Sequence, residues 1–179
     1  QYLEAHPIEP FRPHAMKMLR RARGVEFADR VYTAWVRDRQ FTENCDEFLG
    51  SCDYYLCREA NRPCGTRGYY LSFGYNYCQR SSLYLSARMT PKGQDWLREV
   101  AACLRDRLNT EIPQETSCTE VKRFALESHK ACYVATNFCN QRFTDIIQTL
   151  WMLRPELLKA KILILGFNII GRCLFEENS

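Results

Sequence analysis

Ten cysteines constrain the fold of this 179-residue chain more than any other feature. All of them lie between Cys45 and Cys173, downstream of a cysteine-free N-terminal stretch. Their number is even and no histidine accompanies them, so the pattern predicts up to five disulfides rather than a set of metal ligands. Disulfides persist in oxidising compartments. We therefore expect a secreted, extracellular protein that holds no metal and no cofactor.

The bulk composition is that of a globular protein. Hydrophobic residues make up 46% of the chain and charged residues 26%, so the disulfides reinforce a core rather than replace one. The net charge of +4 allows weak attraction to a sulfated glycan, but the chain lacks the dense basic face of a nucleic-acid binder. Its longest apolar run, Ile162–Ile170, is about half of the ~20 residues that a membrane-spanning helix needs. We expect no transmembrane segment and no nucleic-acid partner.

The N-terminal residues differ in character from the rest. Residues 1–9 lack the basic start and apolar run of a signal peptide, so we expect the mature form of a secreted chain. Three prolines within residues 1–13 prevent a continuous helix. Residues 1–24 are therefore predicted to form an extended, basic N-terminal arm.

Residues 25–179 are predicted to form a single disulfide-rich domain of the all-α class, a disulfide-cross-linked helical bundle. Apolar residues recur every three to four positions over Val25–Phe41, which indicates an amphipathic helix. Residues 45–78 combine five cysteines with glycines, many aromatic residues and turn chemistry at Arg62–Gly68. This segment predicts short helices joined by tight, cross-linked loops. No strand-type alternation lasts for more than a few residues.

Helix starts are marked in the second half of the chain. Thr90 followed by Pro91 is a capping residue with a proline in the first turn. Ser117 and Glu120 match the capping box, which predicts a helix through about Tyr133.

The C-terminal part is expected to contain two helices. Thr144 is predicted to cap the first, and Arg154-Pro155 to end or bend it. The second is predicted over Pro155–Cys173. Cys139 and Cys173 bracket the two helices and could lock them as a hairpin.

Helix geometry excludes one cysteine pair. Cys118 and Cys132 lie fourteen residues apart on one predicted helix, which separates them by about 21 Å at 1.5 Å per residue. A disulfide needs Cα atoms within about 7 Å, so these two cannot pair. We expect each to be bonded to another element, with Cys103 and Cys64 as natural partners.

The cysteine spacing resembles that of the stanniocalcins, a family of secreted helical glycoprotein hormones. The similarity extends from about Cys45 to Cys173, and it includes Thr90–Gly93 through Cys103, the pair Cys132-Tyr133 and the six-residue gap between Cys132 and Cys139. The family's connectivity would imply five bridges. They are Cys45–Cys57, Cys52–Cys78, Cys64–Cys118, Cys103–Cys132 and Cys139–Cys173.

The resemblance implies a non-enzymatic hormone that acts through an extracellular protein or receptor. The themes in that family are calcium and phosphate homeostasis and inhibition of a pappalysin-type metalloprotease, and no residue here can be assigned to these activities. The eleventh cysteine, which links two subunits in vertebrate members, has no counterpart after Cys173. The family's glycosylation sequon near the first cysteines is absent as well. The resemblance therefore does not imply a covalent dimer.

Two sets of side chains are candidates for a binding surface. One is the tyrosine-rich segment near Gly68–Tyr77, whose rings could anchor a partner or, as the favoured alternative, pack around the disulfides. The other is a basic stretch that could bind a sulfated glycan or form a solvated helix face. The candidate residues are Tyr69, Tyr70, Tyr75, Tyr77, Lys17, Arg20, Arg21 and Arg23. The apolar C-terminal helix, with Trp151 beside it, could also supply a non-covalent homodimer face.

No catalytic residue is predicted. His129 could act as a general base, but it has no Asp or Glu at a matching helical offset, so we expect a structural or surface histidine. An extracellular adhesion or recognition module for a cell surface, gamete or host is an alternative function. A lipid-binding or phospholipase A2-like protein is a less favoured one, because Lys130 follows His129 where that chemistry requires a His-Asp pair.

Overall fold

A computed structural model describes residues 21–38, 41–113 and 115–157, together with residues 164 and 166. The regular structure in these ranges is helical and includes no strand, which confirms the predicted all-α class. The sequence predicted one domain from residue 25, and contacts group the chain into two compact units, Gln1–Asn76 and Tyr77–Ser179. Each unit is described by itself. Residues 1–20 lie outside the described ranges, and Arg21–Arg23 are helical rather than extended.

The cysteines of the described ranges are all disulfide-bonded, and none is free. Cys45 pairs with Cys57 at a Cα–Cα distance of 5.7 Å, and Cys103 pairs with Cys132 at 5.8 Å. Both pairs agree with the connectivity that the resemblance implied. The other three implied pairs stay predictions.

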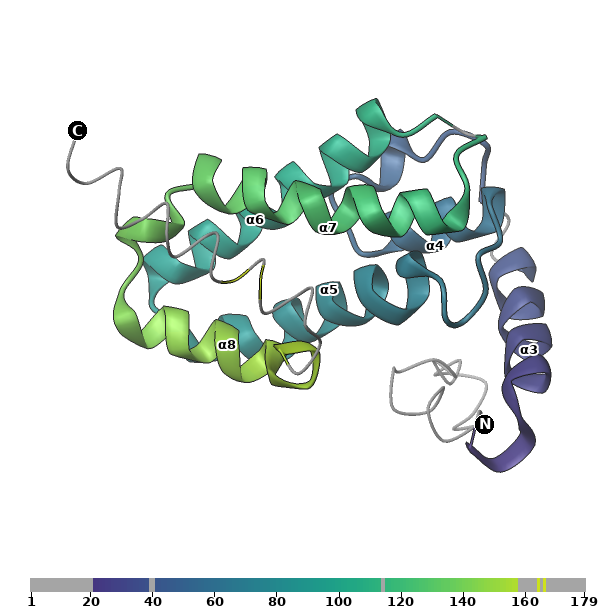
Figure 1. Cartoon of the computed structure of the whole chain (residues 1–179), viewed down its shortest axis with the longest axis horizontal. Helices are drawn as coiled ribbons and strands as arrows, with labels where there is room; N and C mark the ends of the chain where they lie inside the picture. Colours follow the sequence, from purple (N-terminus) through teal and green to yellow (C-terminus); the bar gives the residue numbers. More distant parts are fainter. Residues whose placement is uncertain (1–20, 39–40, 114, 158–163, 165, 167–179) are drawn as a thin grey trace, which may run out of the picture. The chain divides into compact units, whose positions relative to one another are not determined.

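Within the first unit, residues 45–76 form short helical segments joined by tight loops, as the sequence predicted. Helix α3 and the π-helical segment η2 both contact α4, and α4 also contacts the 3-10 turn η1. Figure 1 shows α3 and α4. The bounds are α3 Val25–Asp38, η1 Asp46–Phe48, α4 Asp53–Asn61 and η2 Tyr70–Tyr75.

The core of the first unit is rich in tyrosine. Tyr54 and Tyr55 on α4 are buried with their ring centroids 5.5 Å apart, and Tyr55 also meets the ring of Tyr69 edge-on. Gly74 allows η2 to lie close to α4, because a Cβ atom built on it would be 2.5 Å from Cδ1 of Tyr55. The close approach of these two segments therefore depends on a missing side chain.

Gly74→Ala is expected to lower the free energy of unfolding by about 2 kcal/mol, since an added methyl group in a packed core forces ring or backbone shifts. Urea titration followed by circular dichroism measures the change. Gly50→Ala is the matched control, because a Cβ at Gly50 meets nothing within 4 Å. Equal stability of the two variants would contradict the argument.

The second unit is built around three longer helices. Helices α6 and α7 lie side by side (Figure 1) and are joined by the Cys103–Cys132 disulfide. Trp96 is buried against Phe138 and Tyr133, with ring centroids 5.6 Å away in both cases. The bounds are α5 Asn76–Arg80, η3 Ser81–Leu85, η4 Ser86–Arg88, α6 Pro91–Glu111, α7 Cys118–Ala135, η5 Phe138–Asn140 and α8 Phe143–Leu157.

Both predicted caps in the second unit are confirmed. The hydroxyl of Thr90 accepts a hydrogen bond from the Gly93 amide at the start of α6. Ser117 and Glu120 form the complete capping box of α7. Polar side chains at these positions satisfy amide groups that the helix itself leaves unpaired.

The predicted start of the next helix is wrong, and the helix does not end at Arg154-Pro155. Helix α8 begins at Phe143, so Thr144 lies inside its first turn, where the Arg142 carbonyl accepts the first hydrogen bonds. The helix also continues through Arg154-Pro155 to Leu157. A proline removes one amide donor and disfavours a helical residue before it without forbidding one. The predicted last helix, 155–173, lies outside the described residues beyond Leu157, except that Ile164 and Gly166 are helical.

Candidate functional site: the apolar face of helix α8

Helix α8 is attached to the start of α6 by one buried carboxylate. Asp145 is 1% exposed, and its two oxygens accept hydrogen bonds from the Thr90 amide at 2.9 Å and the Thr90 hydroxyl at 2.6 Å. Thr90 is the capping residue of α6, so a negative charge from α8 lies at the positive end of the α6 dipole. This arrangement fixes which face of α8 points inward.

Gly93 makes room for that carboxylate. A Cβ atom built on Gly93 would be 2.5 Å from Cγ of Asp145, closer than side chains approach in folded proteins. The Thr149 hydroxyl, one turn further along α8, donates to the Asp145 carbonyl at 2.9 Å. Ile146 and Met152 pack against the core cluster that contains Trp96. The inward face of α8 thus packs against the start of α6 and the Trp96 cluster.

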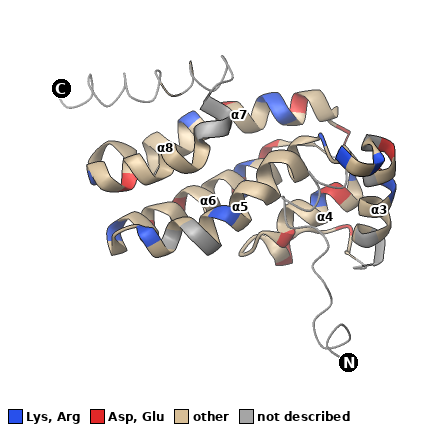
Figure 2. Cartoon of the chain, turned by 90° about the horizontal axis from the view of Figure 1, so that it is seen from below, with Lys and Arg blue, Asp and Glu red and all other residues tan. Residues whose placement is uncertain are grey.

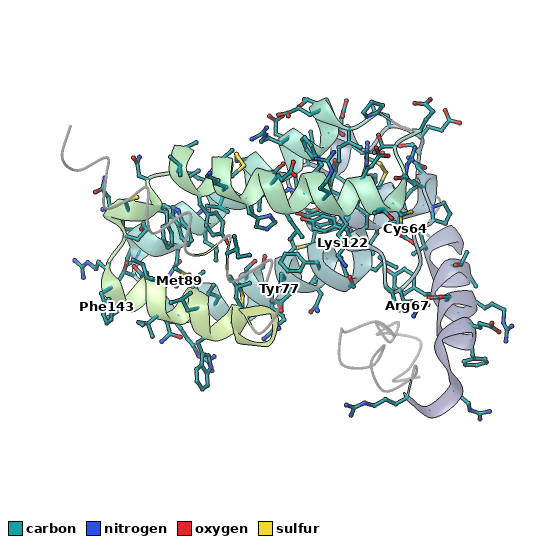
Figure 3. All side chains as sticks on the ribbon, in the orientation of Figure 1. Cys64, Arg67, Tyr77, Met89, Lys122 and Phe143 are labelled. Carbon is teal, nitrogen blue, oxygen red and sulfur yellow. A yellow bond between two sulfur atoms is a disulfide. The ribbon has the colours of Figure 1, made fainter. Side chains whose placement is uncertain are left out.

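The other face of α8 presents large apolar side chains. Phe143 is 76% exposed, Ile147 43% and Trp151 61%. They follow one another at intervals of four residues, so they form a single stripe that extends for about 12 Å along the helix. Figure 3 shows Phe143 at the N-terminal end of α8. We call these three residues the α8 stripe.

The α8 stripe is uncharged over its length. Between Phe143 and Trp151 the chain has one ionisable residue, Asp145, and that carboxylate is buried. Most of α8 is accordingly tan in Figure 2. Tryptophan is among the residues that most often dominate binding energy at protein interfaces, and a contiguous exposed apolar patch is typical of a binding site. The stripe suits non-covalent association with an apolar surface.

The four tyrosines that were candidates for a binding surface do not lie at the surface. Tyr69, Tyr70, Tyr75 and Tyr77 are all buried. A buried ring cannot anchor a partner without rearrangement, so the packing alternative is the one that the structure supports. Tyr77 (labelled in Figure 3) also has the Arg80 guanidinium over its ring at 5.1 Å.

The predicted basic surface is described in part. Lys17 and Arg20 lie outside the described residues. Arg21 and Arg23 are exposed, and the Arg23 guanidinium lies 6.0 Å from the Phe27 ring centroid. A sulfated-glycan site at these residues stays a prediction.

Sequence reasoning placed a possible homodimer face on the predicted last helix, 155–173, with Trp151 beside it, and did not single out α8. It missed Phe143 because it placed the helix start two residues too late: a cap at Thr144 makes residue 145 the first helical one, whereas α8 begins at Phe143. The signal was present in the interval of four residues between Phe143, Ile147 and Trp151. The inward orientation of Asp145, which decides which face is exposed, depends on a contact with Thr90 that no local pattern reveals.

His129 is a buried residue of α7. Its Nδ1 donates to the Ala125 carbonyl at 2.6 Å, and its ring lies edge-on to Tyr133. Burial lowers the pKa of His129, which favours the neutral imidazole. The described residues contain no group of three or more His, Cys, Asp or Glu side chains that could hold a metal ion.

Comparison with known proteins adds no relative: no protein-family model, no curated protein and no solved structure matches the chain. None of the helices in the described part combines the length and hydropathy needed to cross a bilayer.

Proposed function

We propose that this is a secreted, non-enzymatic protein that binds an extracellular protein through the α8 stripe. The observation that carries the proposal is the exposure of Phe143 and Trp151 on a helix whose opposite face is fixed by the buried Asp145. Side chains presented by a rigid element lose little entropy on binding. The stripe is thus preorganised for a partner with an apolar groove or helix face.

The disulfides support the proposed location. Cysteines that would be reduced in the cytosol are paired throughout the described part of the chain. The cysteine spacing that resembles the stanniocalcins extends the proposal to a hormone-like role, in which the partner is a receptor or an extracellular protease. Two of the pairings that this resemblance implied, Cys45–Cys57 and Cys103–Cys132, are present.

The lipolytic alternative is less well supported than binding. A general base must reach the substrate, and the imidazole of His129 is buried with one nitrogen bonded to a backbone carbonyl. An adhesion or recognition role would use the same kind of exposed surface as the proposed binding function. Identifying the protein that binds to this chain would distinguish an adhesion or recognition role from a hormone-like one.

The double variant Phe143→Ser/Trp151→Ser is expected to weaken partner binding at least about 30-fold, because aromatic anchors at an interface contribute about 2 kcal/mol or more. Its free energy of unfolding should change by less than about 0.5 kcal/mol, since these side chains are exposed. The partner is first captured from extracellular fluid with the oxidised protein. Its affinity for each variant is then measured with both proteins purified.

Lys122→Ser is the matched control, an exposed change on α7 that should leave the affinity unaltered. Wild-type affinity in the double variant would overturn the assignment of the stripe. Analytical ultracentrifugation tests whether the stripe instead binds a second copy of this chain. A wild-type dimer that the double variant abolishes would show that the stripe binds a second copy of the chain instead of another protein.

A further inference from the structure

A second feature, in the first unit, concerns two carboxyl groups that hold one loop. Glu59 of α4 accepts hydrogen bonds on Oε1 from the amides of Cys64 and Gly65, at 2.9 and 2.7 Å. Asp29 of α3 accepts on Oδ1 from the next amide, that of Thr66, at 2.8 Å. Gly65 has φ +74°, a left-handed conformation that lets consecutive amides point to one side. Two helices are thus tied to one turn of the loop by acidic side chains.

The second oxygen of Glu59 has no such partner. Glu59 is 5% exposed, and within the described residues its Oε2 is buried without a hydrogen bond. A carboxylate would place half of its charge on this oxygen, whereas a protonated acid needs no ion partner there. Burial without a cationic partner therefore favours a neutral Glu59, whereas the two amides that donate to Oε1 favour the ionised form.

The nearby carboxylate of Asp29 also favours the neutral form of Glu59. The carboxylate of Asp29 faces Glu59 across Gly65, whose built Cβ is 3.6 Å from both Asp29 oxygens. Other charged residues lie on neighbouring segments, but in the described part none of them forms an ion pair or hydrogen bond with Glu59, and η2 carries no charge. These charged residues include Glu26 and Arg30 on α3, Arg58 on α4, Arg62 and Arg67 on the loop, and Asp46 and Glu47 on η1.

We propose that Glu59 and Asp29 form a proton-dependent clasp, closed while Glu59 is a neutral acid and opened when Glu59 ionises beside the Asp29 carboxylate. Opening separates α3 from the loop at residues 62–68, because an ionised Glu59 repels the half-buried Asp29 carboxylate and the new charge can be hydrated only when the loop is released. The clasp makes the docking of α3 depend on pH.

The pKa of Glu59 sets the pH range of this transition. Burial, with a smaller contribution from Asp29, raises it to about 8, although the Gly65 and Cys64 amides lower it in part. The released state has the ordinary value of 4.5. A group whose pKa is raised in the closed state stabilises that state at low pH, and this stabilisation is lost as the pH rises towards 8. The opening equilibrium should increase about 100-fold between pH 5.5 and pH 8, since each pH unit contributes nearly a factor of ten until the increase levels off close to pH 8.

The test is a titration of the folded protein by NMR. The ¹³C signal of the Glu59 carboxyl group should titrate with a midpoint near 8, and the protection factor of the Thr66 amide against hydrogen exchange should fall about 100-fold between pH 5.5 and pH 8. Protection factors already correct for the intrinsic rise of the exchange rate with pH, so the fall reports release of the loop.

Three variants separate the clasp from a general effect of pH. Glu59→Gln keeps an acceptor for the two amides and cannot ionise, so its Thr66 protection should be constant over this range. Asp29→Asn keeps the Thr66 acceptor and should move the Glu59 midpoint downwards. Glu43→Gln removes an exposed carboxylate and should behave as the wild type. A Glu59 midpoint below 6 in the wild type, or the same fall in protection in Glu59→Gln, would overturn the proposal.

Discussion

Replacing Cys103 and Cys132 together by alanine should lower the free energy of unfolding by about 4 kcal/mol, the largest effect that we expect from any pair of substitutions. The disulfide closes a loop with a sequence separation of 29 residues, and the loss of loop entropy in the unfolded chain predicts about 3.6 kcal/mol for that length. Cys132 is also fully buried in the core between α6 and α7, so alanine leaves a small void there. Chemical denaturation of both proteins under oxidising conditions measures the difference.

The Cys45/Cys57 pair provides the matched comparison. Its sequence separation is 12 residues, for which the same relation predicts about 3 kcal/mol. The double alanine variant at 103 and 132 should therefore be the less stable of the two. If the 45/57 variant were the less stable one, packing around the sulfurs rather than loop closure would determine how much each disulfide contributes to the free energy of unfolding.

The features that were predictable from the sequence are the local ones. The amide groups at a helix start must be satisfied within a few residues, so Thr90 and Ser117 identify two starts from sequence alone. The rise of a helix similarly excluded a Cys118–Cys132 bridge, and α7 places both cysteines on one helix. Helix capping and helix rise can be applied to a sequence without knowing which other elements pack against the helix.

The features that escaped prediction depend on contacts between distant residues. The composition of residues 69–77 left open whether the tyrosines bind a partner or pack inward, and the contact of η2 with α4 accounts for the burial of Tyr70 and Tyr75. Asp145 and Thr90 are 55 residues apart, and Asp29 and Thr66 are 37 apart. No periodicity or motif indicates such pairs, although they decide which face of α8 is exposed and what holds the loop after α4.

The contact between α8 and the start of α6 gives the second large effect. Asp145→Ala is expected to lower the free energy of unfolding by about 3 kcal/mol, because the Thr90 amide and hydroxyl lose a charged acceptor. Asp145→Asn should cost less, since its carbonyl oxygen can still accept from the amide. Asp95→Ala, which removes an exposed carboxylate in the same region of α6, should change stability by less than about 0.5 kcal/mol.

Gly93→Ala tests the same contact, because the sign of its effect on the free energy of unfolding should depend on whether Asp145 is present. In the wild type the added Cβ meets the Asp145 carboxylate at 2.5 Å, so a loss of about 2 kcal/mol is expected. In the Asp145→Ala background the carboxylate is gone, and alanine should then stabilise α6 by up to about 1 kcal/mol through its higher helix propensity. Gly93→Ala can destabilise the wild type and stabilise the Asp145→Ala variant only if position 93 needs glycine to leave room for the Asp145 carboxylate. Equal losses in both backgrounds would show that the backbone of α6, rather than the carboxylate from α8, requires glycine at this position.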